Sequence, residues 1–241
     1  MPYYGYYYGF DWTYIVLVLP CVIFSLIASS MVNTTFQKYS KQLSRRNITG
    51  AQAAQRVLAA NGVSGVRIER VSGNLTDHYD PKGNVIRLSD NVYTNTSTAA
   101  IGVACHEAGH AVQYAKSYAP IKLRAAIIPI TNIGSRLAMP LILLGLLLYA
   151  FEDLSYTIVY VGIACFSLSL VFQLITLPVE FNASRRALTA IEDYDILTPD
   201  EQKGARKTLT AAAMTYVAAT AVALAQLLRL ILIFGGRRRN D

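Results

Sequence analysis

Four apolar runs separated by polar stretches dominate the chain and predict long hydrophobic helices. Residues 13–32 carry no charged side chain and reach the ~20 residues that a bilayer crossing requires. Residues 130–151 contain a second run, residues 156–178 form a third, and residues 208–234 form a fourth that contains Arg229. We expect the first three to cross a membrane. The fourth is predicted to be helical, and Arg229 leaves its crossing open.

The polar segment between the first two runs has the pattern of a small folded unit. Thr49 and Gln52 form a capping-box pattern at the start of a short helix, which ends at Asn61 and Gly62. Three segments of strand character follow, separated by turn sequences: residues 66–71, 74–79 and 84–89. They predict a small antiparallel sheet. A second helix is expected over residues 97–117.

Basic residues gather where the apolar runs meet the polar segments. They are Lys38, Lys41, Arg45 and Arg46 after the first run, and Lys116, Lys122 and Arg124 before the second. Residues 152–155 carry none. Because loops rich in Lys and Arg stay in the cytoplasm, we expect residues 33–125 and 179–207 on that side. A fourth crossing would place the basic residues 237–239 outside, whereas an interfacial last helix would remove this conflict.

Composition and charge narrow the class of protein. Hydrophobic residues make up 53% of the 241 residues and charged residues only 15%, which is too apolar for an ordinary soluble domain. A net charge of +7 would suit nucleic-acid binding, but the basic residues lie beside the apolar runs. The three cysteines, Cys21, Cys105 and Cys165, form no CxxC pair and are interpreted as small apolar residues. We therefore expect a multi-pass membrane protein that binds no nucleic acid.

The sequence HEAGH inside the second predicted helix offers the chemistry of a zinc site. Residues four apart share one face of a helix, so His106 and His110 can meet one Zn²⁺ while Glu107 points beside them. Zinc lowers the pKa of a bound water to ~7, and Glu107 can accept its proton and pass it to a leaving amine, which is peptide hydrolysis. The alternative is a surface helix with two solvated histidines. The chain has only 3 histidines, which favours the metal.

A catalytic zinc also needs a third protein ligand and an open fourth position. Glu180, in LPVEFNASRRA, follows the third apolar run on the same predicted side of the membrane as His106, at the start of an expected helix. Its alternative role is that of an interfacial helix cap that interacts with the helix dipole or with Arg residues. The other candidates for the third ligand are His78, Asp77 and Asp80.

Three segments together resemble the bacterial YugP-type membrane neutral zinc metallopeptidases: HEAGHA at 106–111, GSRLAMPLIL at 134–143 and LPVEFNASRRA at 177–187. The resemblance covers nearly the whole chain. It implies a gluzincin-like site with one zinc ion held by His106, His110 and Glu180, similar in plan to the larger HtpX class of membrane metalloproteases. Glu107 would be the catalytic base. That class commonly has an aspartate one turn after the ligand glutamate, where this chain has Ser184, whose helix face is expected to orient Glu180.

Further residues are expected to bind the substrate or its transition state. His78, Tyr79 and Arg185 are candidates to donate hydrogen bonds to the oxyanion that forms during peptide hydrolysis. For His78, the alternative is an ordinary exposed strand residue. The segment NVIRLS at 84–89 precedes the motif helix, and as an edge strand it would pair with an extended peptide through main-chain hydrogen bonds.

These expectations combine into a mainly α-helical integral membrane protein with a small antiparallel sheet and a zincin-like core on the cytoplasmic side of the bacterial plasma membrane. Its parts are an N-terminal anchor (1–35), a zincin-like part with the motif helix (36–125), a transmembrane hairpin (126–178), a cytoplasmic helix with the third ligand (179–207) and a C-terminal hydrophobic helix with a basic tail (208–241). The expected function is zinc-dependent cleavage of peptide or membrane-protein substrates. The alternative is a non-enzymatic membrane scaffold with a structural zinc. No Walker A loop occurs, which argues against an ATP-driven protease.

Overall fold

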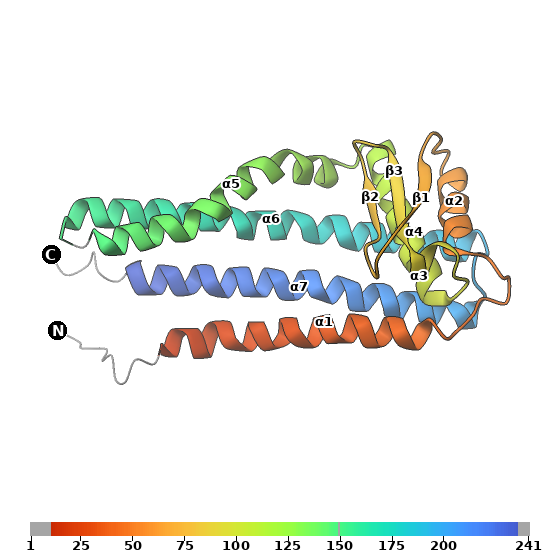
Figure 1. Cartoon of the computed structure of the whole chain (residues 1–241), viewed down its shortest axis with the longest axis horizontal. Helices are drawn as coiled ribbons and strands as arrows, with labels where there is room; N and C mark the ends of the chain where they lie inside the picture. Colours follow the sequence, from red (N-terminus) through yellow and green to blue (C-terminus); the bar gives the residue numbers. More distant parts are fainter. Residues whose placement is uncertain (1–10, 149, 236–241) are drawn as a thin grey trace. The chain divides into compact units, whose positions relative to one another are not determined.

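The computed structural model describes residues 11–148 and 150–235, which are mainly helical with one small sheet (Figure 1). The helices are the π-helical segment η1 (Tyr14–Val18), α1 (Leu19–Tyr39), α2 (Gly50–Ala60), α3 (Asp90–Tyr93), α4 (Thr98–Ala115), α5 (Ala119–Leu147), α6 (Glu152–Asp193) and α7 (Pro199–Gly235). The strands are β1 (Arg67–Val71), β2 (His78–Asp80) and β3 (Val85–Ser89). The basic residues 237–239 lie outside the described residues.

Among the described residues, four helices are long and apolar enough to cross a membrane, which confirms the pattern of apolar runs. They are the helix formed by η1 and α1 (Tyr14–Tyr39), α5, α6 and α7. α7 meets this criterion of length and composition although it contains Arg229.

The chain forms two compact units, each built from separated segments. The helical unit comprises Met1–Ile27, Ala126–Leu174 and Val217–Asp241, and the mixed unit comprises Ala28–Ala125 and Ile175–Tyr216. The mixed unit contains the sheet and α4, the helix that carries the HEAGH motif.

The sheet of the mixed unit has the strand order β1-β3-β2 and is not wholly antiparallel (Figure 1). β2 and β3 form an antiparallel hairpin, in whose turn Asp80 Oδ1 accepts hydrogen bonds from the amides of Lys82 and Gly83. β1 pairs parallel to β3, so the prediction of an antiparallel sheet is wrong for this pair. The reason is that the chain crosses to the far side of β3 after β1 instead of turning back against it. β3 is therefore the central strand, and the prediction that residues 84–89 form an edge strand is also wrong.

The two helices predicted in the polar segment have the ends that their sequences indicate. At the start of α2, Thr49 Oγ1 accepts a hydrogen bond from the amide of Gln52, and Gln52 Oε1 accepts one from the amide of Thr49. This reciprocal pair is a complete capping box. After α2, Gly62 has a φ of 69°, which glycine adopts without strain. Ser97 caps α4 by accepting a hydrogen bond from the amide of Ala100.

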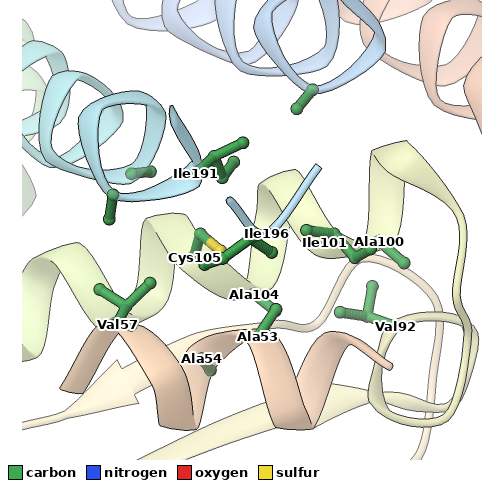
Figure 2. Packing of buried hydrophobic residues seen from close by; sticks show 14 of the residues in the cluster. Ala53, Ala54, Val57, Val92, Ala100, Ile101, Ala104, Cys105, Ile191 and Ile196 are labelled. Atoms are coloured by element: carbon green, nitrogen blue, oxygen red, sulfur yellow. The ribbon is translucent and has the colours of Figure 1, made fainter. Parts of the chain in front are cut away.

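α4 lies in the core of the mixed unit and is buried along most of its length. Figure 2 shows Ala53 and Val57 of α2 on one side of α4, and Ile191 and Ile196, from the end of α6 and the residues after it, on the other. Cys105 is fully buried among these side chains, which confirms its interpretation as an apolar residue. Close packing on these faces fixes the position of the motif residues on α4.

Within the helical unit, an ion pair joins α7 to the residue that precedes the first helix. Arg229 Nε donates a hydrogen bond to Asp11 Oδ2 over 2.9 Å, and the guanidinium lies 5.6 Å from the centroid of the Tyr14 ring. Arg229 therefore has an acidic partner, as charged residues in apolar helices usually do. α5 and α6 approach closely in the same unit, because a Cβ on Gly162 would come within 3.0 Å of the Ala138 carbonyl oxygen.

Candidate metal centre

α4 presents His106, Glu107 and His110 as the helical spacing predicts. The centroids of the two imidazole rings are 4.7 Å apart, and the rings meet edge to face. Glu107 and His110 are buried, and the side chain of His106 is only 14% exposed. The histidines are therefore not the solvated surface residues of the alternative interpretation.

α6 contributes the third member of the cluster, Glu180. Its Oε2 atom lies 3.3 Å from His106 Nε2 and 3.5 Å from His110 Nε2. One potential ligand atom from each of the three residues lies within 4.8 Å of the other two, and within the described part of the chain this is the one group of its kind. The structure thus brings together the three residues that the sequence analysis selected as ligands.

The sequence analysis expected Glu180 at the start of a helix. In the structure, Glu180 lies inside a continuous helix. α6 runs from Glu152 to Asp193 and passes through Pro178. A proline in a helix interior removes a hydrogen bond and costs ~3 kcal/mol, so local propensity favours a break just before Glu180. Because α6 continues, Glu180 has no helix N-terminus to cap, so the helix-dipole part of the alternative role is wrong, whereas an arginine contact is present.

Two distances between the potential ligand atoms match those expected around a tetrahedral zinc ion. Ligand atoms at ~2.0–2.1 Å from such an ion lie about 3.4 Å from one another, which matches the distances of 3.3 and 3.5 Å from Glu180 Oε2 to the two Nε2 atoms. Glu180 Oε2 is buried and accepts no hydrogen bond from any residue that the structure describes. A buried carboxylate oxygen without a partner is costly, so this arrangement suits a bound cation.

Two residues that the sequence analysis did not assign to the site contact the Glu180 carboxylate. Arg124 Nη1 of α5 donates a hydrogen bond to Glu180 Oε1 over 3.0 Å, and Tyr216 of α7 makes a side-chain hydrogen bond with the same carboxylate. The sequence analysis named Arg124 only as one of the basic residues that flank the second apolar run. Tyr216 lies in an Ala- and Thr-rich helix, and nothing in the sequence pattern indicated that it belongs to the site.

Each imidazole has a polar neighbour at the ring nitrogen that faces away from Glu180. His106 Nδ1 lies 3.1 Å from Ser184 Oγ, and His110 Nδ1 lies 3.0 Å from Gln113 Oε1. Such neighbours orient the rings of metal-binding histidines. Ser184 therefore lies at the site, but its side chain contacts His106 and not Glu180, the residue that it was expected to orient.

The electrostatic field at the site favours a positive charge. Burial lowers the pKa of His110, but its contact with Glu180 and the negative charges of Glu107 and Glu180 raise the pKa above the ordinary histidine value. Burial and the charge of Glu107 raise the pKa of Asp77, against the effect of the hydrogen bonds from Ser89. The charge of Glu107 therefore raises the pKa of two side chains, His110 on α4 and Asp77 in the segment that precedes β2.

His78 and Tyr79, two of the candidates for oxyanion stabilisation, lie on β2. His78 is exposed, and its Nε2 atom lies 3.5 Å from Arg87 Nη1 of β3. The Tyr79 hydroxyl donates a hydrogen bond to Asn84 Oδ1, and its ring lies 5.6 Å from that of Tyr114 on α4. Tyr79 thus links β2 to the turn of α4 that follows His110.

The third candidate, Arg185, is exposed on α6 and lines a pocket of about 360 Å³ together with its neighbour Ser184. Asp77 and Asp80, the acidic alternatives for the third metal ligand, have structural partners. Asp77 accepts hydrogen bonds from the amide and hydroxyl of Ser89, and Asp80 accepts them within the β2–β3 turn. Glu180 is therefore the acidic residue that joins the two histidines.

Comparisons with known proteins cover almost all of the chain. A family model described as "Putative neutral zinc metallopeptidase" matches residues 14–235. The chain is 45% identical over 228 residues to the "Putative membrane protease YugP" of Bacillus subtilis (strain 168), covering 94% of this chain and 99% of that protein. No solved structure matches. The chain therefore belongs to the family described as "Putative neutral zinc metallopeptidase".

Proposed function

We propose that this protein is a membrane-bound zinc metallopeptidase that holds one zinc ion through His106, His110 and Glu180. The observation that carries the proposal is the convergence of two imidazole Nε2 atoms and one buried carboxylate oxygen from α4 and α6. Membership of the family and the name of the 45% identical relative support it.

The chemistry divides between the ion and the protein. When bound, zinc makes a water nucleophilic at neutral pH and polarises the carbonyl of the scissile peptide. Glu107 accepts the proton of the attacking water and then delivers it to the nitrogen of the leaving amine. Its place next to His106 on α4 and its electrostatic effect on His110 support this role.

Negative charge that develops on the carbonyl oxygen needs a hydrogen-bond donor. Arg124 and Tyr216 contact the carboxylate of Glu180, so we add them to the candidates His78, Tyr79 and Arg185. Removal of one donor to an oxyanion lowers kcat by ~10²–10³-fold in other proteases, so the residue that serves here would be identified by a loss in kcat at unchanged zinc content.

The sequence analysis gave the binding of an extended peptide to residues 84–89. Because these residues form the central strand, we assign this role to the edge strand β2. β2 lies at one side of the sheet and packs on α4 through Tyr79 and Tyr114. An extended peptide that pairs with β2 by main-chain hydrogen bonds would run beside the motif helix. Binding of this kind tolerates many substrate sequences, because the main chain supplies the contacts.

We place the site at the cytoplasmic side of the bacterial plasma membrane. The basic residues around it support this orientation. Asp11 precedes the first helix and Arg229 lies near the end of α7, so their ion pair puts the beginning of one helix beside the end of the other. This pairing supports a fourth crossing over an interfacial last helix.

The test combines zinc content with cleavage of a fluorogenic peptide by the purified full-length protein. Glu107→Gln is expected to retain about one zinc per chain and to lose cleavage, because the amide cannot accept the proton of the water. Glu192→Gln, the same change at an exposed position of α6, is the control and should keep both properties.

Three results would contradict the proposal. Full cleavage by Glu107→Gln would exclude the proposed base. Stoichiometric zinc in a protein with both His106→Ala and His110→Ala would exclude the proposed metal site. A zinc-containing wild type that cleaves no peptide or membrane protein would favour the non-enzymatic scaffold.

A further inference from the structure

We infer that Gln113 is a positioning residue that holds the His110 ring with its proton on Nδ1 and, through the same amide, sets α6 against α4. The inference rests on the proposed metal site, since it concerns how that site is prepared to bind a cation. It starts from Gln113 itself, whose side chain is fully buried on α4, three residues after His110.

The amide of Gln113 can adopt only one orientation. Its Nε2 donates hydrogen bonds to the carbonyl oxygen of Val179 over 2.8 Å and to Asn182 Oδ1 over 3.0 Å. A backbone carbonyl oxygen can only accept hydrogen bonds, so the NH₂ group must face Val179. A reversed amide would place its oxygen against two acceptor oxygens.

Asn182 is oriented in the same way by a second obligatory partner. Arg186 Nε, which can only donate, donates a hydrogen bond to Asn182 Oδ1 over 2.8 Å. The oxygen of Asn182 therefore faces both Arg186 and Gln113. The guanidinium of Arg186 also lies 6.0 Å from the ring centroid of Tyr118, which helps to hold it in place.

The consequence reaches the metal ligand. Because the NH₂ group of Gln113 faces α6, its Oε1 atom faces His110 Nδ1 at 3.0 Å and can only accept. A neutral His110 must then carry its proton on Nδ1, which leaves the lone pair of Nε2 directed at the position shared with His106 and Glu180. Ser184 cannot impose the same choice on His106, because a hydroxyl both donates and accepts.

The same contacts fix the position of the third ligand. Val179 immediately precedes Glu180, and Asn182 follows it by two residues. Gln113 therefore contacts α6 on both sides of Glu180 in the sequence and ties this turn to His110. A single buried amide thus sets both the protonated nitrogen of one ligand and the position of another.

The test uses ¹⁵N-histidine-labelled full-length protein without zinc, in detergent, at a pH at which the imidazoles are neutral. The chain has 3 histidines, so His78→Gln identifies His78, His106→Gln identifies His106, and the remaining ring is His110. In the wild type, ¹⁵N shifts should show a protonated Nδ1 on His110. Gln113→Leu should shift His110 toward the other tautomer and weaken zinc binding by ~10–100-fold, the usual effect of losing such a partner.

Three further variants separate positioning from loss of structure. Asn182→Asp keeps an acceptor for Gln113 and Arg186, so it should retain the wild-type tautomer and zinc affinity. Asn182→Leu removes one of the two anchors of Gln113 and should give an intermediate loss. Gln202→Leu changes a glutamine that donates to the backbone of Leu197 and should leave the His110 shifts unchanged.

Two results would overturn the inference. One is a wild-type His110 tautomer and wild-type zinc affinity in Gln113→Leu, and the other is an equal loss in Asn182→Asp and Asn182→Leu. Should Gln113→Leu fail to fold, the Asn182 pair decides in the same way. Failure of the proposed function is a different result. Full zinc binding by a protein that lacks His106 and His110 would exclude the proposed metal site, but it would not change the tautomer measured for His110 in the zinc-free wild type.

Discussion

Gly109 of α4 lies directly against the backbone of Ala183 in α6. A Cβ on Gly109 would come within 2.8 Å of the Ala183 carbonyl oxygen, closer than carbon and oxygen atoms approach without a shift of the backbone. Gly109 stands between the two histidines, and Ala183 follows Glu180 by three residues. The glycine of HEAGH therefore allows α6 to approach closely enough for Glu180 to reach both imidazoles.

Gly109→Ala is expected to separate the two helices and to weaken zinc binding. Overpacking of this kind costs about 1–3 kcal/mol, which matches or exceeds the ~1 kcal/mol of helix propensity gained on replacing glycine by alanine. Zinc affinity by competition with a chelator, and thermal unfolding of the zinc-free protein, measure both effects. Gly235→Ala, where the nearest atom lies 3.7 Å from the added Cβ, is the control. Unchanged zinc affinity in Gly109→Ala would show that the approach of the helices is not needed for the site.

Glu180 is expected to give a graded series of variants. Glu180→Gln should lose most of its zinc and all peptide cleavage, because a neutral amide is a much poorer zinc ligand than a carboxylate. Glu180→Asp should be partly impaired, since a shorter side chain moves the oxygen by more than the ~0.2 Å tolerance of a zinc bond. Ser184→Ala should be milder, because it removes only a contact to His106 Nδ1. Full zinc content and activity in Glu180→Gln would mean that another residue is the third ligand.

Features specified by local sequence were predicted correctly. The apolar runs located the four long helices, the capping pattern at Thr49 gave the start of α2, and helical spacing placed His106 and His110 on one face. Each of these depends on residues within one or two turns of each other, where the chemical reason for the structure is present in the segment itself.

Features that depend on packing between distant segments were not predictable in this way. The turn signals identified the β2–β3 hairpin but not which strand β1 would join, because its alternation fits either neighbour. The expected helix start at Glu180 is wrong, because α6 continues through Pro178. The fold also brings single polar residues from three helices to two of the ligands. Gln113 contacts His110, whereas Arg124 and Tyr216 contact Glu180.

Arg124→Met is expected to destabilise the zinc-free protein more than the zinc-bound protein. Without zinc, Arg124 is the cation that hydrogen-bonds the Glu180 carboxylate, whose side chain is only 3% exposed. Breaking a buried pair costs ~3–5 kcal/mol, and we expect about 2–3 kcal/mol because the side chain of Arg124 is 28% exposed. Zinc can replace the lost charge, so the rise in melting temperature on adding zinc should be larger than in the wild type. The exposed Arg206 provides the control Arg206→Met, and an unchanged zinc-induced rise in Arg124→Met would contradict this role.

Cysteine labelling of intact cells tests the orientation in the membrane. With the 3 native cysteines replaced by alanine, Asp153→Cys should react with a membrane-impermeant reagent, whereas Arg45→Cys and Tyr194→Cys should react only after the cells are opened. All three positions are exposed on the protein. Labelling of Arg45→Cys from outside would reverse the proposed orientation.

The ion pair between Asp11 and Arg229 predicts the behaviour of the last helix. Arg229 in an apolar helix is tolerated when its charge has a partner, so Asp11→Asn and Arg229→Gln should each lower the melting temperature of the purified protein. Because both side chains are partly exposed, the coupling in a double-mutant cycle should be modest, about 1 kcal/mol. The exchanged pair Asp11→Arg with Arg229→Asp should recover part of the loss, and a reporter at the C-terminus should lie outside the cell in the wild type. A cytoplasmic reporter with additive single losses would show instead that α7 does not cross beside the first helix.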